Sequence, residues 1–105
     1  QVGVIIYSGK FIKERRPVAQ RWMAAYLKAA ELFNKNGTKD SEIAAILEKY
    51  TKVPGKIIQA AIPPYQDPSG KPLVENLADQ AQWFTTNGMQ QKVTIENALD
   101  LSFLK

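Results

Sequence analysis

The sequence predicts a mostly α-helical chain with about five helices after one N-terminal strand. Two observations support this fold class. Apolar residues recur at helical spacing over most of the chain, and prolines and Asn-Gly pairs stand where those periods begin and end. The first eight residues instead form a run of β-branched and aromatic side chains, which is typical of a strand.

The predicted strand covers residues 1–8, QVGVIIYS, whose near-continuous apolar run suggests burial on both faces. A buried strand needs a neighbour that pairs its backbone N–H and C=O groups. The only other strand candidate is the short stretch 92–95. We therefore expect the partners of this strand to lie in a segment outside this sequence or in another chain.

The first long helix is predicted between Pro17 and Gly37. Proline suits the first helical turn, where its missing N–H has no partner, and glycine suits the left-handed residue after a helix. Residues 9–16 are predicted to be a polar connection, with Arg15 and Arg16 pointing to solvent because a helix N-terminus disfavours cations. The expected core positions form two rows, Val18, Trp22, Ala25, Tyr26, Ala29 and Phe33 beside Met23, Leu27 and Ala30.

Three further helices follow from the same reasoning. The second spans residues 38–52, is entered at Thr38 or Asp40, and carries Ile43, Ile46, Leu47 and Tyr50 on one face. The third begins at Pro54 and stops at a proline pair, and residues 67–70 have the composition of a type I turn. The fourth spans residues 73–88, and a short capped helix from about Thr94 closes the chain.

The composition offers no catalytic chemistry. The chain has no histidine and no cysteine, so the commonest general base, the thiol nucleophile and the usual zinc ligands are missing. The net charge of +4 is spread along the sequence, which does not predict nucleic-acid binding. We interpret the carboxylate pairs Glu75/Asp79 and Glu96/Asp100 as solvated surface and the aromatic residues as core. No catalytic residue, metal ligand or cofactor is predicted.

An ordered set of motifs adds a family resemblance. It comprises Phe11-Ile12 followed by Glu14, Arg15 and Pro17, then Ile46-Leu47 with Tyr50-Thr51, then Gln82-Trp83-Phe84 leading to Gly88, and the terminal Ser102-Phe103-Leu104. Together they resemble the C-terminal part of periplasmic substrate-binding proteins of ABC importers, of the nitrate, sulfonate and taurine type that is related to thiamine-pyrimidine-precursor binders. The resemblance covers nearly the whole chain.

The resemblance implies an α/β parent fold, the periplasmic binding protein type II fold, in which residues 1–105 form one segment of the first of two lobes. It implies a periplasmic or extracytoplasmic, non-catalytic protein that closes its lobes around a small organic or inorganic anion or a thiamine precursor and is read by an ABC permease. Gln1 and Gly3, at the hinge end of the strand, are the positions expected nearest the ligand.

Two alternatives stay open at this point. An enzyme of the thiamine-pyrimidine synthase type on the same fold would need histidine and cysteine chemistry outside this segment. A small helical interaction module would instead form a homo-oligomer, or bind another partner, through its N-terminal strand.

Overall fold

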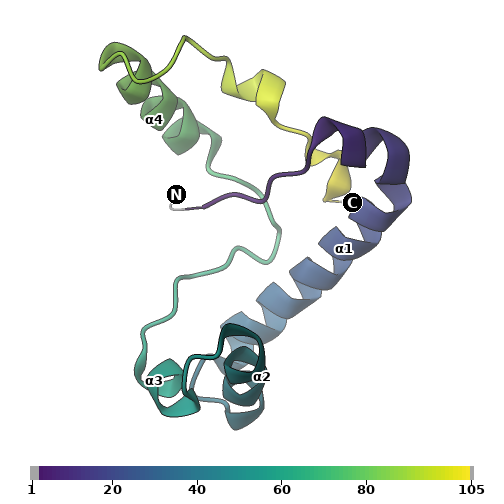
Figure 1. The fold of residues 1–105 in the computed structure, drawn as a ribbon, viewed down its shortest axis with the longest axis vertical. Helices are drawn as coiled ribbons and strands as arrows, with labels where there is room; N and C mark the ends of the chain where they lie inside the picture. Colours follow the sequence, from purple (N-terminus) through teal and green to yellow (C-terminus); the bar gives the residue numbers. More distant parts are fainter. Residues whose placement is uncertain (1–2, 105) are drawn as a thin grey trace. The chain divides into compact units, whose positions relative to one another are not determined.

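A computed structural model describes residues 3–104 of the chain (Figure 1). It contains four α-helices, α1 (Gly9–Asn36), α2 (Ser41–Thr51), α3 (Gly55–Ala60) and α4 (Val74–Thr86), and two short 3-10 helices, η1 (Ile95–Ala98) and η2 (Leu101–Phe103). The chain divides into two compact units. Unit 1 comprises the residues up to Arg21 and those from Lys71 onward, and unit 2 comprises Trp22–Gly70, so that α1 contributes to both.

The predicted α/β fold with an N-terminal strand is wrong, because residues 3–104 contain helices and no strand. Residues 3–8 have no regular secondary structure, and residues 92–95 are a connection into η1. Val4, Ile5 and Ile6 make no hydrogen bond with other described residues, and their side chains are exposed. Their β-branched character favours a strand, but nothing in the described chain lies beside them to pair with their backbone.

Helix α1 consists of two helical parts that meet at a kink, and the residues before the kink are helical rather than the predicted connection. Ser8 explains the start, since its Oγ accepts a hydrogen bond from Phe11 N at 3.1 Å in the manner of an N-cap. The helix is kinked at Arg15, whose φ of −134° and ψ of 33° are not helical. Pro17 accounts for this kink, since its ring removes a donor and crowds the preceding turn.

The predicted end of α1 is confirmed. Gly37 has a φ of +72° and donates its N–H to Phe33 O at 2.7 Å. The core face is narrower than predicted, because Val18 and Trp22 are 40% and 49% exposed. The buried α1 residues are small or flexible, namely Ala19, Met23 and Ala30. The apolar periodicity identified a helix correctly, but it overestimated how much of that helix is covered.

Unit 2 is built around the packing of α2 against α3. Asp40 is the N-cap of α2 and accepts hydrogen bonds from Glu42 N at 2.9 Å and Ile43 N at 3.0 Å, which confirms one of the two predicted entry residues. The buried side chains of the helix pair are Ile43, Ala44 and Ile58. Thr38 is also buried, and its hydroxyl donates to Ala61 O at 3.2 Å, which joins the start of the α2 segment to the end of α3.

The connection after α3 is held against the second half of α1 by one glutamine. Tyr26 donates its hydroxyl to Gln66 Oε1 at 3.0 Å, and Asn34 both donates to Gln66 O and accepts from Gln66 N. The turn at residues 67–70 follows as predicted, with Gly70 N donating to Asp67 O at 2.9 Å.

Lys52 ends α2 in the left-handed conformation, with a φ of 63°. This conformation crowds the Cβ of any residue other than glycine. We expect Lys52→Gly to raise the free energy of unfolding of unit 2 by about 0.5–1 kcal/mol, after allowance for the greater flexibility of glycine in the unfolded chain. Urea denaturation measures the change, with Lys52→Ala as a control that keeps the strain. A loss of stability in Lys52→Gly would contradict this explanation.

Unit 1 contains α4, which ends at the predicted stop. Gly88 has a φ of +67°, and Met89 N donates to Phe84 O at 2.9 Å. Ala81 is buried, and its carbonyl accepts from Gln90 Nε2 at 3.0 Å. The closing segment contains the short helix predicted from about Thr94, which is the 3-10 helix η1, and a second one, η2. The Thr94 side chain does not cap η1. Within residues 3–104, none of the helices combines the length and hydropathy of a membrane span.

Candidate functional site

The structure describes one of the two positions predicted to lie nearest a ligand. Gln1 lies outside the described residues. Gly3 is exposed, belongs to no regular element, and a Cβ built on it would meet no atom within 4 Å apart from its chain neighbours. Ligand contact at these two positions therefore stays a prediction.

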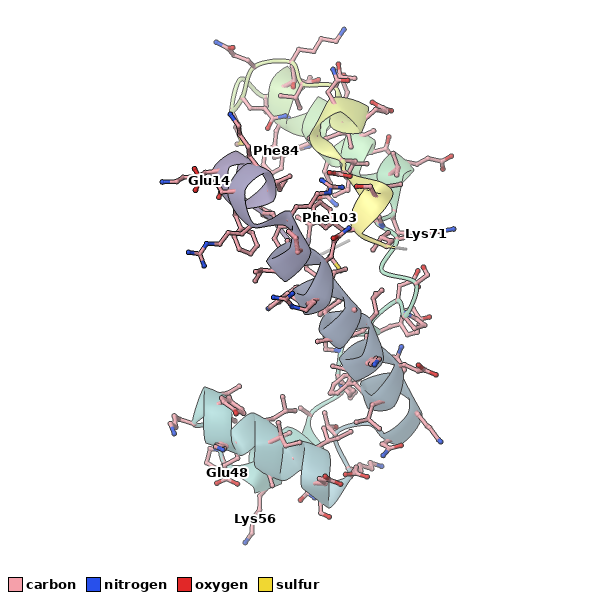
Figure 2. The ribbon with its side chains drawn as sticks, turned by 90° about the vertical axis from the view of Figure 1, so that its right-hand side faces the viewer. Glu14, Glu48, Lys56, Lys71, Phe84 and Phe103 are labelled. Carbon is pink, nitrogen blue, oxygen red and sulfur yellow. The ribbon has the colours of Figure 1, made fainter. Side chains whose placement is uncertain are left out.

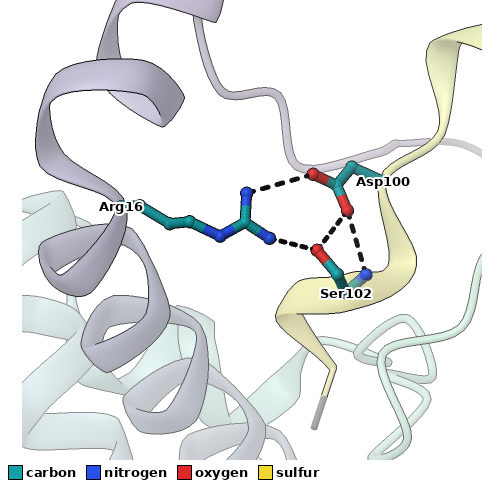
Figure 3. Close-up of polar contacts among 3 residues, drawn as sticks. All are labelled: Arg16, Asp100 and Ser102. Atoms are coloured by element: carbon teal, nitrogen blue, oxygen red, sulfur yellow. Dashed lines mark hydrogen bonds and ion pairs between the residues drawn. The ribbon is translucent and has the colours of Figure 1, made fainter.

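A polar cluster of unit 1 joins Arg16, Asp100 and Ser102 (Figure 3). The Arg16 guanidinium donates to Ser102 Oγ and lies 3.5 Å from Asp100 Oδ2. Asp100 Oδ1 accepts from Ser102 N at 3.0 Å and from the Ser102 hydroxyl. Asp100 is the N-cap of η2, so the carboxylate both starts this turn and holds Arg16.

An aromatic group lies beside the polar cluster. Phe103 is 4% exposed, and Arg16 Cζ lies 4.3 Å from the centroid of its ring. Figure 2 labels Phe103. Tyr7 packs edge-on against both Phe103 and Phe11, with centroid distances of 5.3 and 5.5 Å. The Tyr7 hydroxyl donates to Ala19 O at 3.0 Å, and burial raises the pKa of Tyr7. We call these six residues, Tyr7, Phe11, Arg16, Asp100, Ser102 and Phe103, the C-terminal anchor.

The contacts of the C-terminal anchor hold the start of α1 and η2 together. Hydrogen bonds from the Ser102 hydroxyl and backbone, with a smaller contribution from Arg16, hold the pKa of Asp100 below its ordinary value of 3.8. A carboxylate with a lowered pKa is a poor proton acceptor, so it does not activate the Ser102 hydroxyl as a nucleophile. The chain has no histidine to take that role.

The C-terminal anchor corrects one sequence prediction. Arg16 was expected to point to solvent, but its side chain is half-buried and contacts Asp100, Ser102 and Phe103. Asp100 is exposed, as its interpretation as surface implied, but its carboxylate contacts Arg16 and Ser102. The sequence carried a local signal for the cap, a carboxylate two residues before a serine, but no signal for a partner 86 positions away.

A shallow groove lies between α2 and α3 in unit 2, lined mainly by Ala44, Ala45, Glu48, Gly55, Lys56 and Gln59. Figure 2 labels Glu48 and Lys56 on its two helices. The Glu48 carboxylate is already used, because Oε2 accepts from Gly55 N at 3.1 Å and so supports the start of α3. The groove is open to solvent and lacks a convergent set of polar groups, so it does not resemble a small-molecule site.

The aromatic residues predicted to be core are largely exposed. Tyr50, Trp83 and Phe84 are exposed, and so is Trp22, whose ring stacks on Tyr26 at 5.7 Å with an interplanar angle of 5°. Their spacing correctly indicated helices, but few side chains of residues 3–104 cover these rings. Among the same residues, no group of three potential metal-binding side chains comes together, and the pair Glu75 and Asp79 has no third ligand.

The lowered pKa of Asp100 predicts a pH effect on unit 1. A carboxyl whose folded pKa is depressed stabilises the fold above its unfolded pKa, and this stabilisation is lost as the pH falls through the folded pKa. Asp100→Asn should therefore destabilise unit 1 at neutral pH and differ less from the parent chain at about pH 3. Urea midpoints at the two pH values measure this, and a difference independent of pH would contradict it.

Comparisons with protein-family models, curated proteins and solved structures found no match for this chain. The family resemblance accordingly rests on the motifs in the sequence.

Proposed function

We propose that this chain is part of the solute-binding component of an ABC importer of the nitrate, sulfonate, taurine or thiamine-precursor class. In this role it makes and breaks no covalent bond. The described residues, which contain helices and no strand, would serve as a helical support within a larger binding protein.

The contact between the stretches that carry the first and the last of the resembling motifs is the observation that supports this proposal best. Arg16 stands between two positions of the first motif, Arg15 and Pro17. It donates to Ser102 and lies over the ring of Phe103, both of which belong to the terminal Ser-Phe-Leu motif. Figure 3 shows the polar part of this contact. The two stretches, far apart in the sequence, therefore hold each other in place.

Exposed apolar side chains are a second support. Ile62, Ile6 and Tyr65 are 96%, 82% and 77% exposed, and no large side chain among residues 3–104 is fully buried. Single exposed apolar residues are ordinary, but so many large ones favour a chain that packs against further polypeptide. A segment of a larger binding protein would have this property.

Binding would follow from a difference in affinity between two conformations. A solute that binds a closed form more tightly than an open form shifts the population toward the closed form, and a permease can recognise that form. The C-terminal anchor would act at a distance from the solute, by keeping the start of α1 rigid.

A ligand screen on the longer protein tests the proposal. The protein is purified from the source cell with an antibody against the 105-residue chain, and its melting temperature is measured with nitrate, taurine, an alkanesulfonate and a hydroxymethylpyrimidine. At about one hundred times Kd, a ligand adds roughly 2.7 kcal/mol of stability, which is a clear upward shift. Tris or chloride at the same concentration is the control. No shift with any member of these solute classes would contradict the proposed function.

Self-association is a second candidate function, favoured by the state of residues 4–6. Val4, Ile5 and Ile6 combine exposed β-branched side chains with backbone groups that make no hydrogen bond to other described residues. No charged residue lies between Gly3 and Gly9, so two copies of this segment would meet without charge repulsion. Because a pair of such short segments is only marginally stable, we expect weak, concentration-dependent association.

Sedimentation velocity over a wide concentration range measures this association. The second candidate predicts that the mean mass rises with concentration, and that Ile6→Lys lowers it while Ile62→Lys, at another highly exposed isoleucine, does not. A monomer at every concentration would contradict self-association and leave the solute-binding proposal intact.

A further inference from the structure

Two Asn-Gly pairs end helices in this chain, Asn36-Gly37 after α1 and Asn87-Gly88 after α4. Asn-Gly is the dipeptide most prone to deamidation, because glycine has no side chain to hinder its backbone nitrogen. That nitrogen attacks Cγ of the asparagine side chain, the bond from Cγ to the side-chain nitrogen breaks, ammonia leaves, and a succinimide ring forms. Water then opens the ring to aspartate or isoaspartate.

Asn36-Gly37 is held on both sides. The attacking nitrogen of Gly37 donates a 2.7 Å hydrogen bond to Phe33 O. The Asn36 side chain donates to Asp40 Oδ2 at 3.2 Å, and the other oxygen of Asp40 caps α2. The next residue, Thr38, is buried and bonded to Ala61 O. Freeing Gly37 N therefore disturbs the whole corner between α1 and α2.

Asn87-Gly88 is held more weakly. Gly88 N donates to Thr85 O at 3.1 Å, a bond of the tight type found where helix ends fray. Asn87, Gly88 and Met89 are all exposed, and no helix follows until η1 begins at Ile95. The Asn87 side chain donates to Trp83 O, within the same last turn of α4, so this bond is released when that turn opens. Freeing Gly88 N thus requires only local fraying.

From this contrast we infer that Asn87 is the site of spontaneous deamidation in the folded protein, and that the fold protects Asn36. Isoaspartate at position 87 lengthens the main chain by one atom, which displaces the bond from Met89 N to Phe84 O that closes α4. Aspartate at 87 places a negative charge at the negative end of the helix. Either product destabilises the last turn of α4, so the end of this helix becomes less stable as deamidation proceeds.

The test compares the two asparagines within one sample. The whole chain is incubated at mildly alkaline pH, folded in buffer or unfolded in urea, and peptide mass spectrometry follows the conversion of each asparagine. The unfolded sample supplies the intrinsic rates. We expect folding to slow the deamidation of Asn36 by a factor roughly tenfold larger than that of Asn87, because the corner at Gly37 opens less often. Equal slowing at both sites, or faster conversion of Asn36 in the folded chain, would overturn the inference.

Two variants keep the test specific. Asp40→Ala removes the partner of the Asn36 side chain and the cap of α2, so it should speed conversion of Asn36 severalfold and leave Asn87 unchanged. Asn87→Gln removes the reactive side chain, and the last turn of α4 should then stay resistant to proteolysis during the incubation. Unchanged conversion of Asn36 in Asp40→Ala would show that these contacts do not protect it.

Discussion

We expect Phe103→Ala to lower the free energy of unfolding of unit 1 by about 3–5 kcal/mol, the usual effect of truncating a buried phenylalanine. Phe103 is 4% exposed, contacts Tyr7 edge-on and lies under the Arg16 guanidinium, so the truncation leaves a cavity and removes both contacts. A unit of this size has about 3–8 kcal/mol of stability in total. The truncation should therefore remove a large part of the stability of unit 1, and it would unfold the unit at 25 °C if the total lies at the low end of this range.

Tryptophan fluorescence reads this effect locally. The chain has two tryptophans, and Trp83 lies in unit 1 while Trp22 lies in unit 2. In a Trp22→Phe background, Trp83 alone reports the urea unfolding of unit 1. Leu101→Ala, in the same turn but 47% exposed, is the matched control and should change stability by less than about 1 kcal/mol. Phe103→Leu keeps much of the volume if Phe103→Ala cannot be purified. Equal effects at positions 101 and 103 would contradict the C-terminal anchor.

In unit 2, we expect the largest effect from Ile58→Ala, which should lower the free energy of unfolding by about 2–4 kcal/mol. Ile58 is 8% exposed and is the buried residue of the six-residue helix α3. A helix this short is not stable by itself, so its position depends on packing against α2. Removing the side chain should release α3 and, with it, the bond from Thr38 to Ala61 O.

The neighbouring residue provides the control for Ile58. Ile57 has the same chemistry and is 59% exposed, so Ile57→Ala should cost less than about 1 kcal/mol. In a Trp83→Phe background, Trp22 reports the unfolding of unit 2. If both isoleucines gave the same loss, the buried face of α3 would have to be assigned differently.

The parts of the fold that could be predicted are those decided within a few residues. Asp40 as a cap, Gly37 and Gly88 as helix ends and the turn at residues 67–70 follow from local backbone chemistry. The short helical part before the kink at Arg15 was missed because Ser8 was assigned to a strand, although serine is a common N-cap.

The parts that could not be predicted depend on partners far along the chain. The run at residues 4–6 has strand propensity, but a strand also needs a neighbour, and the described residues provide none. Trp22 and Val18 show that periodicity identifies an apolar face without showing what covers it. Arg16 was assigned to solvent because its partners, Asp100 and Ser102, come from the other end of the chain. The predicted ligand positions, Gln1 and Gly3, depended on the family resemblance and stay a prediction.

The measurement that tests the proposed function most directly is the intact mass and cellular compartment of the natural protein that contains this sequence. Mass spectrometry after immunoprecipitation from envelope and cytoplasmic fractions gives both values. A solute-binding component predicts a considerably longer chain in the envelope fraction, with the 105 residues as one part of it. A mature protein of about this length in the cytoplasm would contradict the solute-binding proposal, because the groove between α2 and α3 is open to solvent and does not enclose a solute.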